Sequence, residues 1–310
     1  MKRFAILFAC AAMVSAHEGP EHEIEELTER INKHGETAAL LTERAVEYRV
    51  MGKLAEATKD LERAVALAPG SLAAHRELAR VLFLGGKTSE ALDSIVRALK
   101  LPGEEPADTA SLRMLRAEIF RAQKENKKAV EECDAGLKLY KKNPEWYLLR
   151  SDIQSRLKMH KERVVGLEEG IKETGAGVLE IERVEAMIDA GQCVVALKII
   201  EAELADSRIK SSWLIRRAHA LLALGRKAEA EADLKAALKE IAQRMNPRTP
   251  DVPLLLDIAL AQELLGERKD ALRSYEDARE KGASDSINEK IKALLEVVGS
   301  PEKRDVPEKK

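Results

Sequence analysis

The sequence predicts an all-α fold, a right-handed superhelical solenoid of about seven helix-turn-helix repeats with a capping helix at each end. Three observations support this prediction. Charged residues make up 34% of the 310 residues and aromatic residues only 3%, which is typical of long exposed helices. A pattern of two amphipathic helices in Leu40–Pro69 recurs along nearly the whole chain. Its period, between about 20 and 50 residues, indicates stacked supersecondary units.

Seven turns separate the two helices of the successive repeats. They fall at Gly52, Gly86, Lys124, Lys158, Gly191, Gly225 and Gly266. The steps between them are 34, 38, 34, 33, 34 and 41 residues, so the copies stay nearly in register. The two longest steps, 38 and 41 residues, contain the proline-containing insertions 102–108 and 246–252, which we interpret as connections between helices.

Three positions around each turn keep their character from copy to copy. Mostly small residues stand seven before the turn, at Ala45, Ala79, Ala117, Ser151, Val184, Ala218 and Ala259. The residues five after it are Ala57, Ala91, Ala129, Arg163, Ala196, Ala230 and Ala271. Larger side chains mostly stand nine after it, at Leu61, Ile95, Cys133, Leu167, Ile200, Leu234 and Tyr275. Small residues let two helices approach closely, and the larger ones can pack between neighbours.

With these positions the chain resembles the tetratricopeptide repeat family, most closely in 38–71 and in 211–244, where ALGRKAEAEADLKAAL keeps every signature position. The resemblance covers roughly 90% of the chain after residue 16. It implies that the first helix of each pair lines a concave groove. The copies at 144–176 and 177–210 depart from the pattern, with Arg163 and Glu203 in slots that the family fills with alanine, so their boundaries stay open.

Residues 1–16, MKRFAILFACAAMVSA, predict a secretory signal peptide cleaved after Ala16, and hence a periplasmic or secreted protein. The apolar run Phe4–Val14 is shorter than the roughly 20 residues that a membrane-spanning helix needs, so we expect no stable membrane insertion. An alternative interpretation is a lipoprotein anchored through Cys10.

The remaining chain divides into four predicted parts. A polar segment with a capping helix takes 17–37, one continuous repeat solenoid 38–285, a second capping helix 286–299, and a disordered tail 300–310. Ile24, Leu27 and Ile31 recur at helical spacing in the first cap, before a left-handed stop expected at Gly35. Ser286 opens the second cap, whose apolar stripe is Ile287, Ile291, Leu294 and Val298.

The sequence predicts no enzyme and no cofactor. The histidines are scattered at 17, 22, 34, 75, 160 and 219, and no nucleophile, base or phosphate-binding loop accompanies them. Cys133 and Cys193 fall in different repeats, and we interpret them as buried small apolar side chains. Loss of the leader gives a net charge of about −4, which argues against nucleic acid as a partner. As an alternative, His17 and His22 beside three glutamates would bind Cu(II) or Zn(II).

The resemblance therefore favours a non-catalytic protein-protein interaction scaffold of the bacterial envelope, a monomer that binds a peptide or a helix of an unidentified partner protein in its groove. The alternative is an accessory subunit of an envelope secretion or assembly machine. The family's groove-facing spacing selects Arg49, Arg76, Arg80 and Arg121 in repeats 1 to 3, and Glu145, Asp152, Glu185 and Asp189 in repeats 4 and 5. Apolar residues accompany them at Val46, Phe83, Met114, Leu148 and Ile181. An acidic part of the ligand is expected at repeats 1 to 3, unless these charges form only a solvated face.

Overall fold

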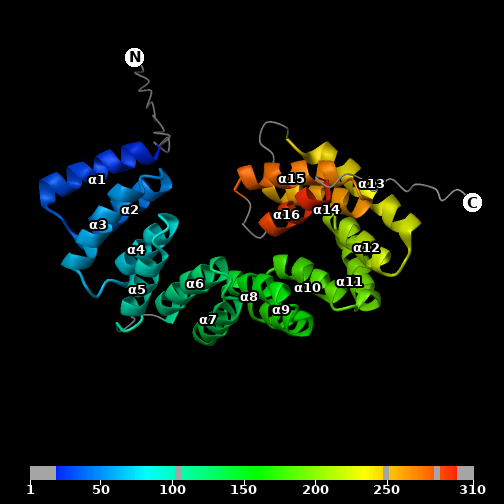
Figure 1. Cartoon of the computed structure of the whole chain (residues 1–310), viewed down its shortest axis with the longest axis horizontal. Coiled ribbons are helices and arrows are strands. Elements are labelled where there is room, and N and C mark those ends of the chain that lie inside the picture. The colour runs from blue at the N-terminus through cyan, green and yellow to red at the C-terminus, as the bar shows by residue number, and fades with distance from the viewer. Residues whose placement is uncertain (1–18, 102–105, 247–250, 283–286, 299–310) are drawn as a thin grey trace, which may run out of the picture. The chain divides into compact units, whose positions relative to one another are not determined.

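The computed structural model describes residues 19–101, 106–246, 251–282 and 287–298 (Figure 1). These residues form sixteen α-helices and no strand, which confirms the predicted all-α class. Contacts between Cα atoms divide the chain into two compact units, Met1–Tyr140 and Lys141–Lys310, which are described separately below as unit 1 and unit 2. The predicted signal peptide, His17, Cys10 and the tail lie outside the described residues.

Unit 1 contains the first seven helices. They are α1 (Pro20–His34), α2 (Ala38–Val50), α3 (Leu54–Leu67), α4 (Leu72–Leu84), α5 (Thr88–Ala98), α6 (Pro106–Ala122) and α7 (Asn126–Leu139). The pairs α2 and α3, α4 and α5, and α6 and α7 each pack together as repeats 1 to 3. The first helices of successive repeats also touch, α2 against α4 and α4 against α6.

Unit 2 contains the other nine. They are α8 (Pro144–Arg156), α9 (His160–Thr174), α10 (Val178–Asp189), α11 (Cys193–Asp206), α12 (Ser211–Ala223), α13 (Lys227–Arg244), α14 (Val252–Leu265), α15 (Arg268–Glu280) and α16 (Asn288–Val298). Repeats 4 to 7 are the pairs from α8 and α9 to α14 and α15, and their first helices again touch in succession. Each unit is therefore a stack of helix pairs, as predicted.

The seven predicted turn residues share one backbone conformation. All have positive φ, from 58° at Lys158 to 80° at Gly266. Glycine adopts this region without a Cβ clash, whereas Lys124 and Lys158 adopt it as non-glycine residues. The turn therefore fixes the geometry of the repeat even where its glycine is missing.

The three repeated positions around the turns are buried in every repeat. Each side chain is at most 2% exposed, except Arg163 at 6%. Cys133 and Cys193 are buried, as predicted for core side chains. The prediction that small and larger side chains fill the space between helices is confirmed, and only the arginine needs a separate explanation.

The two capping helices pack on their neighbours. Helix α1 contacts α2, and its Leu27 and Ile31 are buried in one cluster with Leu40 and Leu41. Helix α16 contacts α15 through its own buried apolar stripe. The stop after α1 differs in part from the prediction: Gly35 has the positive φ of a left-handed residue, 87°, but its ψ of 166° lies outside the left-handed helical region.

An arginine on the first helix pairs with an acid on the second in three repeats. Arg44 donates two hydrogen bonds to Asp60, at 2.7 and 2.9 Å, and Arg217 donates two to Asp233, both at 2.7 Å. Arg116 donates one hydrogen bond to Glu132, whose other oxygen accepts one from Arg113. Arg44, Arg116 and Arg217 each stand 16 residues before their acid, and we call this pair the arginine clamp.

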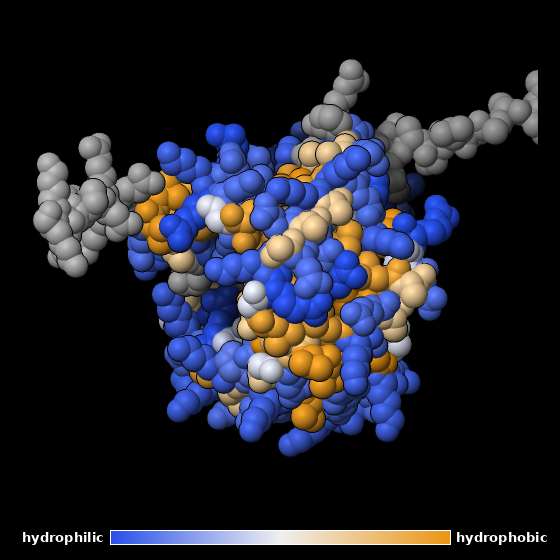
Figure 2. Space-filling view, turned by 90° about the vertical axis from the view of Figure 1, so that its right-hand side faces the viewer, coloured by the Kyte–Doolittle hydropathy of each residue, from blue (hydrophilic) through white to orange (hydrophobic). Residues whose placement is uncertain are grey.

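Some apolar surface stays exposed on unit 2. Figure 2 shows hydrophobic areas among hydrophilic ones on the face turned to the viewer. The large apolar side chains of unit 2 that are at least half exposed are Val165, Val178, Val194, Val195 and Leu295. In the described ranges, no helix combines the length and the hydropathy that crossing a bilayer requires.

Candidate functional site

The first helices of unit 1 carry the arginines that the sequence selected. Arg49 lies at the end of α2, Arg76 and Arg80 lie on α4, and Arg121 lies at the end of α6. All four are half-buried. We call the surface formed by these residues the first-helix face of unit 1.

Two of these arginines share one carboxylate. Glu77, only 8% exposed, lies 3.4 Å from Nε of Arg49 and 3.5 Å from Nε of Arg76. Arg76 also donates a hydrogen bond of 3.2 Å to Oγ of Ser111 on α6. These arginines therefore hold α2, α4 and α6 together as well as facing the solvent.

Arg80 is different, because no salt bridge joins it to any of the residues that the structure describes. Its Nε is buried and makes no hydrogen bond. A carboxylate of a ligand would therefore meet a guanidinium that no carboxylate of the described residues already pairs with.

Apolar side chains lie on the same helices. Val50 at the end of α2 is 58% exposed, and Leu84 at the end of α4 is 55% exposed. They occupy equivalent positions of repeats 1 and 2. Met114 is half-buried, and Phe83 is partly buried against the core of unit 1. The first-helix face of unit 1 therefore combines arginines with exposed apolar side chains at the ends of α2 and α4.

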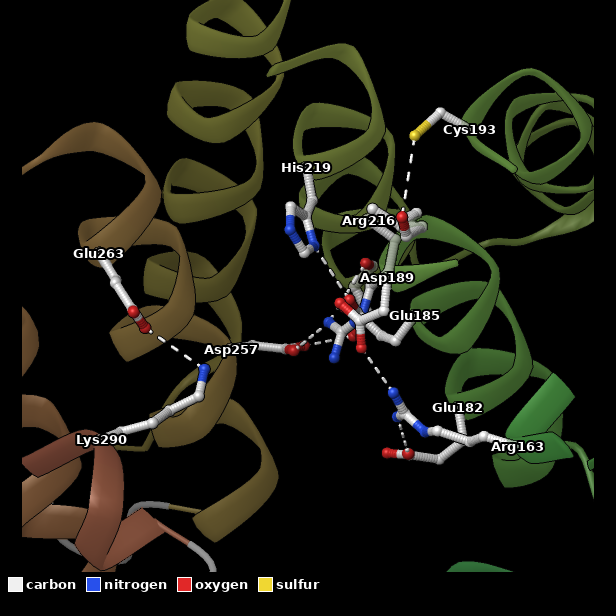
Figure 3. A network of polar contacts seen from close by, with 12 residues as sticks. Arg163, Glu182, Glu185, Asp189, Cys193, Arg216, His219, Asp257, Glu263 and Lys290 are labelled. Carbon is white, nitrogen blue, oxygen red and sulfur yellow. Dashed lines mark hydrogen bonds and ion pairs between the residues drawn. The ribbon is translucent and has the colours of Figure 1, made fainter. Parts of the chain in front are cut away.

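Three of the four acids selected in unit 2 pair with cations of the chain itself, and Figure 3 shows two of them, Glu185 and Asp189. Glu185 lies 3.0 Å from Nε of Arg216 and 3.0 Å from Nδ1 of His219. Asp189 lies 2.6 Å from Nη1 of Arg163. Asp152 pairs with Arg156 at 3.3 Å. Among the other selected residues, Leu148 and Ile181 are half-buried and Glu145 is exposed.

Arg163 explains why its repeat departs from the family pattern. It stands in the alanine slot on α9, donates a hydrogen bond of 2.8 Å to Ser151 on α8, and reaches Glu182 and Asp189 on α10. One buried guanidinium thus links three helices. Its five donors allow this, because they point in fixed directions to several acceptors at once.

Arg216 links the next three first helices. In Figure 3 its guanidinium lies between Glu185 of α10 and Asp257 of α14. Asp257 also accepts a hydrogen bond from the Ser212 hydroxyl. Farther along, Lys290 of α16 pairs with Glu263 at 3.3 Å, and Glu263 accepts a hydrogen bond of 2.8 Å from Tyr275. Ion pairs therefore link α9 with α10, α10 with α12, α12 with α14, and α14 with α16.

Burial and pairing shift the pKa values of this network in opposite directions. Burial alone would raise the pKa of Glu185, but the hydrogen bond with His219 and the charge of Arg216 outweigh it and hold that pKa below its usual range. The hydrogen bond with Glu185 raises the pKa of His219 against the opposing effect of burial. Both shifts favour the charged pair.

Arg163, Arg216, His219 and Asp257 were not among the residues selected from the sequence. For Arg216, His219 and Asp257, the sequence contained a signal in the repeat spacing. His219 follows Glu185 by 34 residues, and Asp257 follows Arg216 by 41. These distances equal the steps between the corresponding turns. Opposite charges one repeat apart on first helices could therefore have been read as pairs.

No metal cluster of three or more His, Cys, Asp or Glu side chains occurs in the part of the chain that the structure describes. His22 lies in the first turns of α1, and its proposed companion His17 lies outside this part. The idea of an N-terminal metal site is therefore untested.

The comparisons with known proteins come from sequence and from structure. One tetratricopeptide repeat model matches residues 42–106 and 85–144, and a second matches residues 214–243. A comparison with curated proteins found no match.

Two solved structures illustrate the likeness in fold. A tetratricopeptide repeat protein from Parabacteroides merdae is 18% identical, with a TM-score of 0.59 over 90% of this chain and 100% of that one. Yeast Tom70 is 16% identical, with a TM-score of 0.52 over 90% of this chain and 58% of that one. At these identities the structural likeness shows the fold alone. The matched models, together with the seven turns, make this chain a member of the tetratricopeptide repeat family.

Proposed function

We propose that this protein is a non-catalytic scaffold of the bacterial envelope, and that it binds an acidic and apolar segment of a partner protein on the first-helix face of unit 1. Scaffolds of this family generally mediate contacts between proteins. The export part of the proposal rests on the leader-like residues 1–16. The binding part rests on Arg80, an arginine that forms no salt bridge with any of the described residues, with Leu84 exposed on the same helix.

Two of the acids selected in unit 2 are less available to a ligand than the arginines of unit 1. Glu185 and Asp189 already neutralise cations of the chain, so binding a basic ligand there would require breaking those pairs. A ligand carboxylate that binds Arg80 would displace no salt bridge between described residues. The preference for an acidic ligand at repeats 1 to 3 therefore follows from which charges remain available.

Photo-crosslinking in living cells tests this proposal. A benzoyl-phenylalanine at position 84 should crosslink a specific partner in the periplasmic fraction, and the Arg80→Glu substitution should abolish that adduct. Lys127→Glu is the matched control, because it makes the same charge change at an exposed residue on α7. Retention of the adduct in Arg80→Glu would refute binding at this face. Protein found only in the cytoplasmic fraction would refute export.

A further inference from the structure

A furrow runs along the opposite side of unit 1, between the second helices of repeats 1 and 2. Helices α3 and α5 both pack against α4, which supplies the floor through Leu78, Val81 and Leu82. Two cavities of about 500 and 430 Å³ lie along it and share Glu62 and Leu82. A cavity of this size is in the range of ligand pockets.

The furrow lies where the arginine clamp is missing. Repeats 1, 3 and 6 fill the corresponding place with their own arginine, as in Arg44 with Asp60. In repeat 2 the equivalent residues are Leu78 and Ser94, so neither charge is present. Ser94 is fully buried and donates to the main-chain oxygen of His75. Leu78 lines the larger cavity, and so does Asp93, the residue before Ser94 in the sequence.

The rim of the larger cavity is acidic. Glu62, Glu90 and Asp93 line it together with a single cation, Arg97. Within the described ranges neither Glu62 nor Asp93 has a salt bridge, and Glu90 is only within 4.0 Å of Lys87. Three carboxylates thus surround an apolar floor.

Repeats 5 and 6 form a second furrow at the equivalent positions, which lie 139 residues further along the chain. There the cavity is about 270 Å³, and Arg217 lies in it with its clamp partner Asp233. Glu201 and Glu229 correspond to Glu62 and Glu90. Pairing with Asp233 is the main cause that raises the pKa of Arg217, and the charges of Glu201 and Glu229 add to it. A cation over Leu78 would meet Glu62 and Glu90 in the places of Glu201 and Glu229, with Asp93 as the third carboxylate instead of a clamp acid.

We propose that the furrow of repeats 1 and 2 binds an amphipathic helical segment of a partner protein, whose arginine or lysine enters the cavity over Leu78. The side chain's methylene groups pack on the apolar floor, and its charged end pairs with Glu62, Glu90 and Asp93. The partner supplies the cation that repeats 1, 3 and 6 supply themselves. This surface is separate from the first-helix face and takes the opposite charge.

Fluorescence anisotropy with defined peptides tests the proposal on the full chain. The probes are labelled helical peptides of about 14 residues, with leucines on one face and a single central arginine, in several leucine spacings. Matched peptides carry glutamine or glutamate in place of the arginine. At least one arginine peptide should bind, and its glutamine counterpart should bind about tenfold more weakly, since a partly buried ion pair is lost.

The decisive variant carries Leu78→Arg with Ser94→Asp, which restores the clamp and fills the cavity. Its affinity for the arginine peptide should fall at least about tenfold, while its melting temperature, measured by circular dichroism, stays unchanged. If this variant unfolds, Asp93→Asn gives the same test at an exposed residue without touching the core. Two control variants should leave binding unchanged. One is Ala232→Asp, which adds a carboxylate in the other furrow at the position equivalent to Asp93. The other is Arg80→Glu on the first-helix face.

Three results would overturn the proposal. The first is equal binding of the arginine and glutamine peptides. The second is undiminished binding by the variant with the restored clamp. The third is no binding by any peptide of the set. Loss of binding in Arg80→Glu would place the peptide on the first-helix face instead, which also contradicts the proposal and leaves the proposed function to be judged by its own test.

Discussion

Two glycines on α9 give a quantitative test of how repeat 4 is packed. A Cβ at Gly170 would lie 2.6 Å from Cγ of Tyr147 and 2.9 Å from Cδ1 of Leu179. Those two residues are 1% and 0% exposed, so they have no room to move. A Cβ at Gly166 would lie 2.8 Å from Nη2 of Arg150, which is the far end of a flexible side chain.

The substitutions Gly166→Ala and Gly170→Ala share one favourable contribution. Alanine stabilises a helix interior by about 1 kcal/mol relative to glycine. Overpacking a rigid core costs about 1–3 kcal/mol, and contacts below 3 Å with a buried ring place Gly170 at the upper end. We therefore expect Gly170→Ala to lose about 2 kcal/mol and Gly166→Ala to be unchanged or about 1 kcal/mol more stable.

Hydrogen exchange followed by mass spectrometry measures this locally, which matters because stacked repeats need not unfold in one step. In Gly170→Ala, the slowest amides of 144–174 should open about 30-fold more often, the factor that corresponds to about 2 kcal/mol. Peptides from 72–84 serve as the internal reference. Equal shifts in the two variants, or greater protection in Gly170→Ala, would refute the packing argument.

Two further predictions concern the charged pairs. Arg44→Leu should destabilise repeat 1 by about 1–3 kcal/mol, because it leaves the buried Asp60 carboxylate without its bidentate partner. The double variant Arg44→Leu with Asp60→Ser has the same residue types as Leu78 and Ser94 of repeat 2. It should recover most of the lost stability, measured by urea titration, and no recovery would argue against the clamp. For His219, a pKa raised in the folded state means that its contribution is complete below pH about 6.5 and is lost as the pH rises through the folded pKa. His219→Gln should therefore lower the urea midpoint at pH about 6 but not at pH about 9, and an equal loss at both values would contradict the pairing with Glu185.

The repeat architecture could be predicted from sequence because its determinants are local. Gly52 and its counterparts mark the positions of positive φ, and the alanines around them mark where helices approach. Both signals return at each step of 33 to 41 residues, so each copy reinforces the others. Even Lys124 and Lys158, which lack the glycine, were located by spacing alone. The conformation at Gly35 was misjudged because no repeat fixes the chain between α1 and α2.

The charged residues show what the sequence leaves undecided. The periodicity correctly places Arg80 and Glu185 on first helices. It does not show which of the two is already paired within the chain, so both were candidates for binding a partner. Only the packed structure shows that Glu185 is held by Arg216 and His219, while Arg80 has no such partner among the described residues. Whether a charge is used internally depends on which side chains of the neighbouring repeats come within about 4 Å, and this follows from the crossing of helices in three dimensions rather than from spacing along one helix.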